Sequence, residues 1–350
     1  MKRLRRGRSY GDVLLVPKRS PVDSRRDVDL STSLTPTIDI ETPLLSAPMD
    51  TVTEAETAIA LDSVGGFGTI HRFSSVPEQR REVERAVEAG SLVGAAVGVR
   101  NNYLERTSEV LDAGVDVVMV DVAHGHLEKT LTAVSHIRTE FPDVELIAGN
   151  VATPEGVEDL AAAGADGVKV GIGPGSHCTT RKVAGAGVPQ FTAIVDTSEV
   201  ARDLGVTVVA DGGIRSSGDA VKALMAGADS VMMGSLFAGT EESPGDLVVR
   251  NGKRYKPSRG MATTAANRAR PEAENDPPTA DEGVEALAPY SGALEDVARE
   301  FAAGIQSGLS YVGGETIDEA RDKAEFIEAA PSAQDREGPH FDRDWESPLT

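Results

Sequence analysis

The sequence predicts an α/β fold in which eight short parallel strands and their crossover helices close into a (β/α)₈ barrel. Short apolar runs alternate with amphipathic stretches from residue 43 onward. The runs are β-branched and apolar on both faces, as are the strands of a parallel sheet covered by helices. The segments LDAGVD (111–116), AAAGAD (161–166) and LMAGAD (224–229) each place a glycine between a helical pattern and a new strand. The alternative is an open, doubly wound sheet, but PLLSAPMD lacks the glycine-rich fingerprint that usually follows the first strand of that fold.

The expected strands follow one another at regular intervals. They are PLLSAP (43–48), GFGTIH (66–71), LVGAAVG (92–98), VDVVMVDV (115–122), VELIAGN (144–150), GVKVGIG (167–173), VTVVADGG (206–213) and DSVMMGS (229–235). The stretches between them are the expected helices. PEQRREVERAVEAG (77–90), for example, opens with proline and closes with glycine, as helix termini prefer. A last helix is expected over 295–313.

The chain is expected to form one barrel domain over residues 1–330. Residues 1–42 precede the first strand and should cover one end of the barrel. The segment after the eighth strand is rich in proline, alanine and acidic residues, so we expect a mobile flap over about 262–288. The polar tail 331–350 has the composition of a disordered segment.

The composition excludes several classes of partner. The net charge of −21 would repel a phosphate backbone, so nucleic acid is not an expected partner. Abundant acid with only 4% aromatic residues indicates a surface adapted to high salt, where charge repulsion is screened. The apolar runs are far shorter than the roughly 20 residues of a membrane helix, and no apolar segment follows the basic N-terminus. We therefore expect a cytoplasmic protein without a membrane partner.

The single cysteine, Cys178, cannot form a disulfide within the chain. It lies in GIGPGSHCTTR (171–181), a glycine-rich loop after the sixth strand, rather than in an apolar run. Active sites of this fold lie at the carboxyl ends of the strands. A thiol that ionises at such a position can act as a nucleophile.

Two further loops extend this site. ADGGIR (210–215) follows the seventh strand and MGSLFAG (233–239) follows the eighth, where barrels of this kind usually hold a phosphate. Asp211, at the tip of the seventh strand, is suited to accept hydrogen bonds from ribose hydroxyls. A thiol, a phosphate cradle and a sugar-binding carboxylate together indicate covalent attack on a phosphorylated nucleoside.

These motifs, with SAPMDTVT (46–53) and RGM (259–261), closely resemble the IMP dehydrogenase/GMP reductase family over about residues 8–328. The resemblance implies that Cys178 attacks carbon 2 of a purine nucleoside monophosphate. It implies that Asp121 and Asn150 face the nicotinamide of NADPH or NAD(H), and that carbonyls of Gly173, Gly175 and Cys178 bind K⁺. It also implies a homotetramer. The implied nucleotide contacts are Ser46, Met49, Ser176, Asp211, Gly213, Gly234, Ser235, Gly260 and Met261.

The resemblance leaves the reaction to be decided between two branches. The paired regulatory CBS domain of dehydrogenases is absent, and no Arg-Tyr pair, the water-activating pair of dehydrogenases, stands between Met261 and Glu282. Thr180 and Glu282 match the pair with which GMP reductases handle ammonia. The expected reaction is therefore the NADPH-dependent reduction of GMP to IMP and ammonia.

Two alternatives stay open. RKVAGAGVPQ (181–190) and GTEESPG (239–245) are typical of IMP dehydrogenases, which oxidise IMP to XMP with NAD. In that reaction Arg268 or Arg270 would have to serve as the base. The third hypothesis is a nucleotide-binding barrel without catalytic activity.

Overall fold

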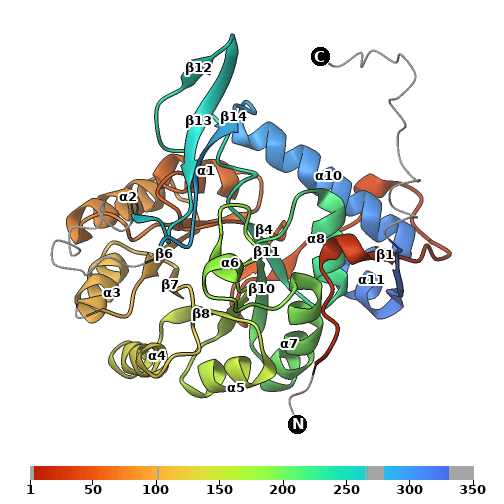
Figure 1. Cartoon of the computed structure of the whole chain (residues 1–350), viewed down its shortest axis with the longest axis horizontal. Coiled ribbons are helices and arrows are strands. Elements are labelled where there is room, and N and C mark those ends of the chain that lie inside the picture. The colour runs from red at the N-terminus through yellow and green to blue at the C-terminus, as the bar shows by residue number, and fades with distance from the viewer. Residues whose placement is uncertain (1–3, 101, 265, 267–279, 331–350) are drawn as a thin grey trace.

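The computed structural model describes residues 4–100, 102–264, 266 and 280–330. Its centre is a closed barrel of eight parallel strands, which confirms the predicted fold class (Figure 1). Each predicted apolar run contains one of these strands. They are β4 (Leu44–Ser46), β5 (Phe67–Ile70), β6 (Val93–Val97), β7 (Val117–Asp121), β8 (Glu145–Val151), β9 (Gly167–Val170), β10 (Thr207–Asp211) and β11 (Ser230–Met233). Sequential neighbours pair around the ring, and β11 closes it against β4.

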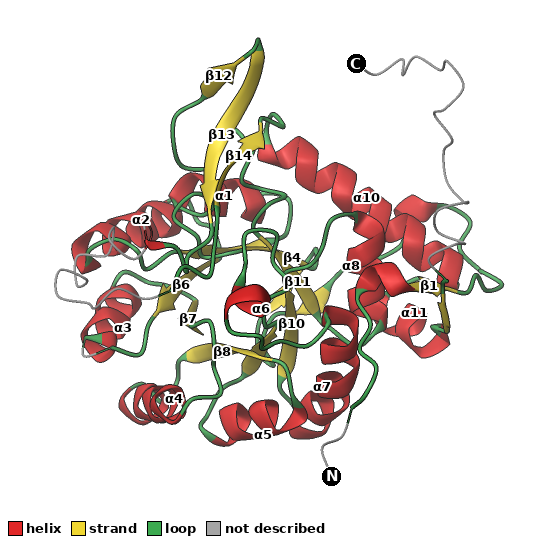
Figure 2. Ribbon diagram, viewed as in Figure 1, coloured by secondary structure: helices red, strands yellow, loops and turns green. Residues whose placement is uncertain are grey.

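Helices surround the barrel (Figure 2), and a helix directly follows each of the barrel strands from β4 to β10, whereas β12, β13 and β14 separate β11 from α10. The second helix shows how the sequence fixes their ends, because Ser75 and Glu78 form a capping box and Pro77 lies in the first turn. No helix in the described ranges is both long and apolar enough to cross a membrane. The helices are α1 (Ala55–Asp62), α2 (Val76–Glu88), α3 (Tyr103–Asp112), α4 (Glu128–Glu140), α5 (Pro154–Ala162), α6 (Thr180–Val183), α7 (Gln190–Leu204), α8 (Ser217–Met225), α10 (Leu294–Val312) and α11 (Ile317–Lys323).

The N-terminal segment closes the end of the barrel that lies opposite the carboxyl ends of the strands. Leu34 and Ile40 are buried in one apolar cluster with barrel-lining side chains such as Phe67 and Met119. The Thr207 hydroxyl donates a hydrogen bond of 2.7 Å to the Leu34 carbonyl. The part of the predicted cover around Leu34 and Ile40 therefore closes this barrel end, and residues 1–3 lie outside the described residues. The short elements here are η1 (Tyr10–Asp12), β1 (Val13–Leu15), η2 (Arg25–Asp27), β2 (Thr32–Ser33) and β3 (Asp39–Ile40), and β1 pairs with β15 (Phe326–Glu328).

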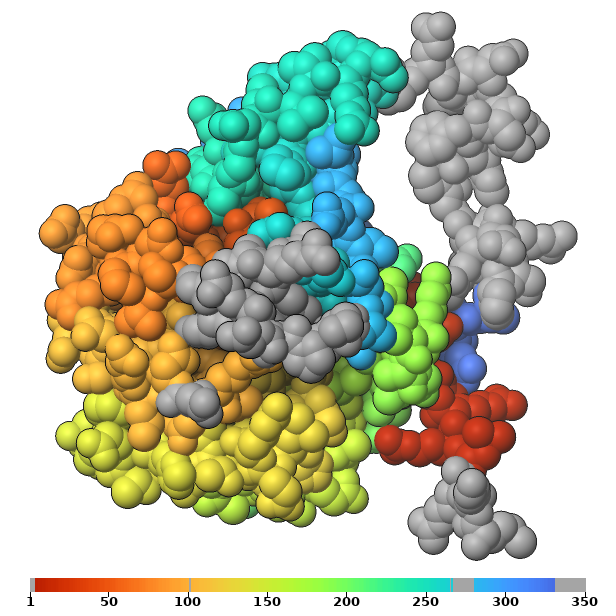
Figure 3. Space-filling view, turned by 60° about the vertical axis from the view of Figure 1, so that its left-hand side comes forward, coloured from red at the N-terminus to blue at the C-terminus, as the bar shows by residue number. Residues whose placement is uncertain are grey.

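The segment after β11 differs in part from the predicted flap. Strands β12 (Val248–Arg250) and β13 (Lys253–Arg259) form a hairpin that projects from the barrel (Figures 1 and 3). Strand β14 (Glu285–Pro289) adds to β13 in antiparallel register. The end of the predicted flap is thus an ordered strand, because its backbone completes the sheet edge that β13 offers. Residues 267–279 of the flap and the predicted tail 331–350 lie outside the described residues.

Candidate active site

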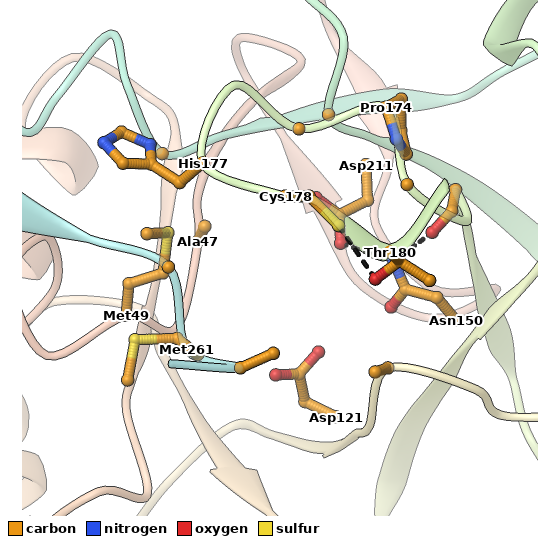
Figure 4. A pocket seen from close by; sticks show the side chains of 18 of the residues that line it. Ala47, Met49, Asp121, Asn150, Pro174, His177, Cys178, Thr180, Asp211 and Met261 are labelled. Atoms are coloured by element: carbon orange, nitrogen blue, oxygen red, sulfur yellow. Dashed lines mark hydrogen bonds between the residues drawn. The ribbon is translucent and has the colours of Figure 1, made fainter. Parts of the chain in front are cut away.

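A cavity of about 870 Å³ opens at the carboxyl ends of the barrel strands (Figure 4). It collects residues from loops that are far apart in the sequence, including the loops after β4, β7, β9, β10 and β11 and the segment before β14. Almost every residue predicted for the site lines this cavity. They are Met49, Asp121, Asn150, Gly173, Gly175, Ser176, Cys178, Thr180, Asp211, Gly213, Gly234, Ser235, Gly260, Met261 and Glu282.

Ser46 is the exception among the predicted nucleotide contacts. It is the last residue of β4 and is fully buried, and it does not line the cavity. Its hydroxyl accepts a hydrogen bond of 2.8 Å from the Thr53 hydroxyl. The contact of Ser46 with a nucleotide therefore stays a prediction that the cavity lining does not support. Ala47, Pro48 and Met49, which follow it, form this wall of the cavity instead.

The loop that carries Cys178 is a tight turn fixed by its own backbone. The Cys178 amide donates to the Gly175 carbonyl at 3.1 Å. Gly173 has a φ of +75°, in the left-handed region that favours glycine. The Arg181 guanidinium donates to the carbonyls of Ile172 and Val188, which ties the two ends of the loop together. The Cys178 thiol is half-buried and lies 3.1 Å from the Thr180 hydroxyl.

The described end of the flap segment packs directly against this loop. The Thr179 amide donates to the Glu282 carbonyl at 2.9 Å, and the Val284 amide donates to the His177 carbonyl at 3.0 Å. Cys178 and Gly283 are opposite each other in this short antiparallel bridge. The bridge brings Glu282 into the same cavity wall as Thr180, as the predicted pairing of these two residues requires.

Glycines at the tips of β10 and β11 allow close approach of a ligand to the backbone. Gly212 and Gly213 have φ of +87° and +79°, and both lie against Pro174 of the cysteine loop. A Cβ atom on Gly234 would lie 2.7 Å from the Met49 sulfur. Consecutive glycines of this kind expose backbone N–H groups that can bind an anion. The arrangement fits the predicted phosphate cradle.

Carboxylates at the ends of β7 and β10 also line the cavity. Asp121 and Asp211 are the last residues of their strands, and their side chains are 19% and 20% exposed. The Asn150 amide donates to Asp211 Oδ2 at 2.8 Å and to the Gly171 carbonyl at 2.9 Å. The residues predicted for ribose and for nicotinamide therefore form one connected group.

Several residues of the cavity wall were not predicted from the sequence. Lys169 on β9 contacts both Asp121 and Asp211. His177, which precedes Cys178, has its Nδ1 atom 3.1 Å from the Ser176 hydroxyl, and burial lowers the pKa of its imidazole. Arg72 and Arg100 line the cavity as well. A lysine inside the apolar run GVKVGIG was a visible signal, because a lysine is rarely buried without a partner.

Comparison with known proteins agrees with this geometry. The model of the "IMP dehydrogenase / GMP reductase domain" family matches residues 7–340. The chain belongs to the IMP dehydrogenase/GMP reductase family. It is 36% identical to inosine-5'-monophosphate dehydrogenase of Nitrosopumilus maritimus (strain SCM1), over 95% of this chain and 98% of that protein. The identity is 38% to the enzyme of that name from Borreliella burgdorferi, over 95% and 96% of the two chains, and 33% to the one from Bacillus subtilis (strain 168), over 95% of each.

Membership of the IMP dehydrogenase/GMP reductase family makes the chain a nicotinamide-dependent oxidoreductase of purine nucleotides. The alignment with the Nitrosopumilus maritimus protein extends over 466 positions, whereas this chain has 350 residues. More than a hundred positions therefore lie opposite gaps. This agrees with the observation that the segment after β5 runs directly into α2 and β6, without an inserted domain.

Proposed function

We propose that this chain is an IMP dehydrogenase, which oxidises carbon 2 of IMP through a covalent adduct on Cys178. The observation that carries the proposal is the Cys178 thiol at the wall of a cavity that also contains the glycine cradle and Asp211. The relatives compared above, all named inosine-5'-monophosphate dehydrogenase, support this direction of the reaction over the reductase expected from the flap.

The proposed reaction has two steps at one carbon. The Cys178 thiolate adds to carbon 2 of IMP, and the hydride that leaves this carbon passes to the nicotinamide of NAD. Water then attacks the oxidised adduct, the C–S bond breaks and XMP leaves while the thiol is restored. We propose that the Thr180 hydroxyl, 3.1 Å from Cys178 Sγ, orients that water and that Glu282, which lines the same cavity, takes its proton in place of the arginine base expected from the sequence.

Reduction of GMP is the second candidate function. The observation that favours it is the absence of an Arg-Tyr pair from the sequence between Met261 and Glu282. The same thiol would add to GMP, ammonia would leave with a proton delivered through Thr180 and Glu282, and NADPH would supply hydride to the adduct. Arg268 and Arg270, the alternative bases for the dehydrogenase, lie outside the described residues.

One pair of assays separates the two reactions. In potassium buffer, the first cuvette contains IMP and NAD, and the second contains GMP and NADPH, while absorbance of the reduced nicotinamide is followed. We expect the signal to rise in the first cuvette with formation of XMP. A falling signal in the second cuvette alone, with release of ammonia, would establish the reductase. Loss of turnover in Cys178→Ala tests the adduct in either case, and normal turnover of this variant would refute the mechanism.

We also propose that the carbonyls of Gly173, Gly175 and Cys178 bind K⁺. The Gly175 carbonyl accepts one hydrogen bond from the Cys178 amide, which leaves its second lone pair for a cation. Such a carbonyl site differs from a cluster of His, Cys, Asp or Glu ligands, which the described ranges do not contain. Activity in KCl should exceed activity in choline chloride of the same ionic strength.

The homotetramer, the single domain over 1–330 and the cytoplasmic location stay predictions. Light scattering on the purified chain measures the first of them. Limited proteolysis measures the second, because a single domain should yield one resistant fragment that ends near residue 330.

A further inference from the structure

The barrel contains one buried ammonium group that the proposed reaction does not use. Lys169 lies on β9 and is 1% exposed. Its Nζ atom donates a hydrogen bond to Asp121 Oδ1 and lies 3.0 Å from Asp211 Oδ2. A buried lysine is stable in a barrel only where carboxylates compensate its charge, and here two of them do so.

The contacts of Lys169 join the two halves of the cavity. Asp211 stands at the end of β10, in the part proposed for ribose, and Asp121 stands at the end of β7, in the part proposed for the nicotinamide. Asn150, at the end of β8, donates to the same Asp211 oxygen that Lys169 approaches. Side chains from four consecutive strands of the barrel, β7 to β10, therefore form one hydrogen-bonded group.

Lys169 carries the only positive charge among the four side chains of this group. Two carboxylates and one ammonium give a net charge of −1. Burial by itself lowers the pKa of Lys169, but attraction by Asp121 and Asp211 outweighs burial and raises the pKa above its ordinary value. The ammonium is therefore charged throughout the neutral range.

We infer that Lys169 is a positioning residue that couples the nucleotide and cofactor halves of the site, by holding the carboxylates of Asp211 and Asp121 in place. The inference rests on the proposed function, because it takes from it the ligand that each carboxylate meets. Without the ammonium, the two carboxylates repel each other and Asp211 moves from the position that meets the ribose. Lys169 touches neither ligand in this account and acts only through the two aspartates.

The test measures binding of IMP alone by calorimetry, at about pH 6 and about pH 8, for the wild type and for Lys169→Met. At pH 8 we expect the dissociation constant of the variant to exceed that of the wild type by at least about tenfold. At pH 6 one of two facing carboxylates takes up a proton more readily than an isolated one, and this proton replaces the missing charge. The ratio of the two dissociation constants should then fall to within about threefold.

Two further variants separate charge from packing. The double variant Asp121→Asn/Lys169→Met has the same net charge of −1 as the wild-type group. Its dissociation constant for IMP should therefore lie within about threefold of that of the single variant Asp121→Asn. Lys256→Met is the matched control, because Lys256 is also a buried lysine but donates to the carbonyls of Ser243 and Gly245. The ratio of the IMP dissociation constants of Lys256→Met and the wild type should be the same at both pH values.

The outcomes distinguish failure of the inference from failure of the proposed function. A wild type that binds neither IMP nor GMP would overturn both. Two results would overturn the inference alone while the wild type binds IMP. The first is a dissociation constant of Lys169→Met that equals that of the wild type at pH 8, and the second is a ratio of these two constants that does not change with pH. If Lys169→Met does not fold, the charge-matched double variant decides, and weak binding of IMP by that folded variant would count against the coupling.

Discussion

The ion pair between Asp50 and Arg259 connects the two segments that form one wall of the cavity. Met49, Gly260 and Met261 line the cavity. Asp50 directly follows Met49, and Arg259 directly precedes Gly260. Arg259 Nε donates to both oxygens of Asp50 at 3.1 and 3.0 Å, and the Arg259 amide donates to the Thr51 hydroxyl at 3.2 Å. The Asp50 carboxylate raises the pKa of Arg259 above its usual range. Arg259→Met should therefore leave Asp50 as a buried charge without this partner.

The magnitude follows from the burial of the pair. Breaking a fully buried ion pair costs about 3–5 kcal/mol, whereas an exposed pair contributes about 0–1 kcal/mol. The Asp50 side chain is 8% exposed and the Arg259 side chain is 26% exposed, so the pair is closer to the buried case. We expect Arg259→Met to lower the free energy of unfolding by about 2–3 kcal/mol. The corresponding fall in Tm is on the order of 5 °C for a chain of this length.

Thermal unfolding followed by circular dichroism measures this effect. The double variant Asp50→Asn/Arg259→Met should be more stable than Arg259→Met, because it no longer buries an uncompensated carboxylate. Arg299→Met is the matched control, since Arg299 pairs with Glu295 on the surface and its loss should leave Tm nearly unchanged. A Tm for Arg259→Met within 1 °C of the wild type, or a double variant less stable than the single one, would refute the reasoning.

Three other predictions address the loop and the cavity floor. Thr180→Val removes the hydroxyl 3.1 Å from the Cys178 thiol, so kcat/KM should fall by about tenfold to a hundredfold while Tm stays near its wild-type value. Gly171→Ala would place a Cβ atom 2.1 Å from the Asp211 carbonyl oxygen, so this variant should lose folded protein in a urea titration at concentrations that the wild type withstands. Burial lowers the pKa of His177, so its contribution to stability is complete above its unfolded-state pKa of about 6.5 and is lost as pH falls below that value. His177→Gln should therefore flatten the stability profile between about pH 5 and 7.

The regular part of the fold could be predicted because each strand carries the pattern of a strand buried on both faces. The run VDVVMVDV (115–122) is apolar except for Asp116 and Asp121, and β7 lies inside this run with four of its five residues buried. Strand β14 could not be recognised in the same way. Its sequence EALAP contains a proline and no β-branched residue, and it is a strand only because β13 offers it an edge.

Residues of the site could be predicted where they follow one another in a single loop. They were missed where residues of separate strands meet. The Cys178 loop is continuous in sequence, so the nucleophile and its glycines are visible together. The environment of Lys169 depends instead on the closure of the barrel, which brings Asp121 from β7 and Asp211 from β10 to the same ammonium. Ser46 shows that a recognisable motif does not by itself indicate exposure, because it is the last residue of β4 and is fully buried.

The binding of an anionic nucleotide by a chain of net charge −21 has a consequence that can be measured. A phosphate approaching this surface is repelled, and the repulsion is screened as the Debye length falls from about 10 Å at 0.1 M salt to about 3 Å at 1 M. Short contacts with the backbone amides of the glycine cradle are screened much less. With K⁺ held constant and choline chloride added, the dissociation constant of IMP should therefore fall as salt rises.

Inosine is the matched control for this measurement, because it lacks the phosphate, and its affinity should depend much less on salt. The opposite trend for IMP, in which added salt weakens binding, would mean that exposed cations at the cavity, such as Arg100 or Arg215, attract the phosphate more strongly than the acidic surface repels it. In that case the acidic composition would have no influence on the substrate. This trend would refute both the predicted adaptation of the surface to salt and the proposed binding of the phosphate by backbone amides.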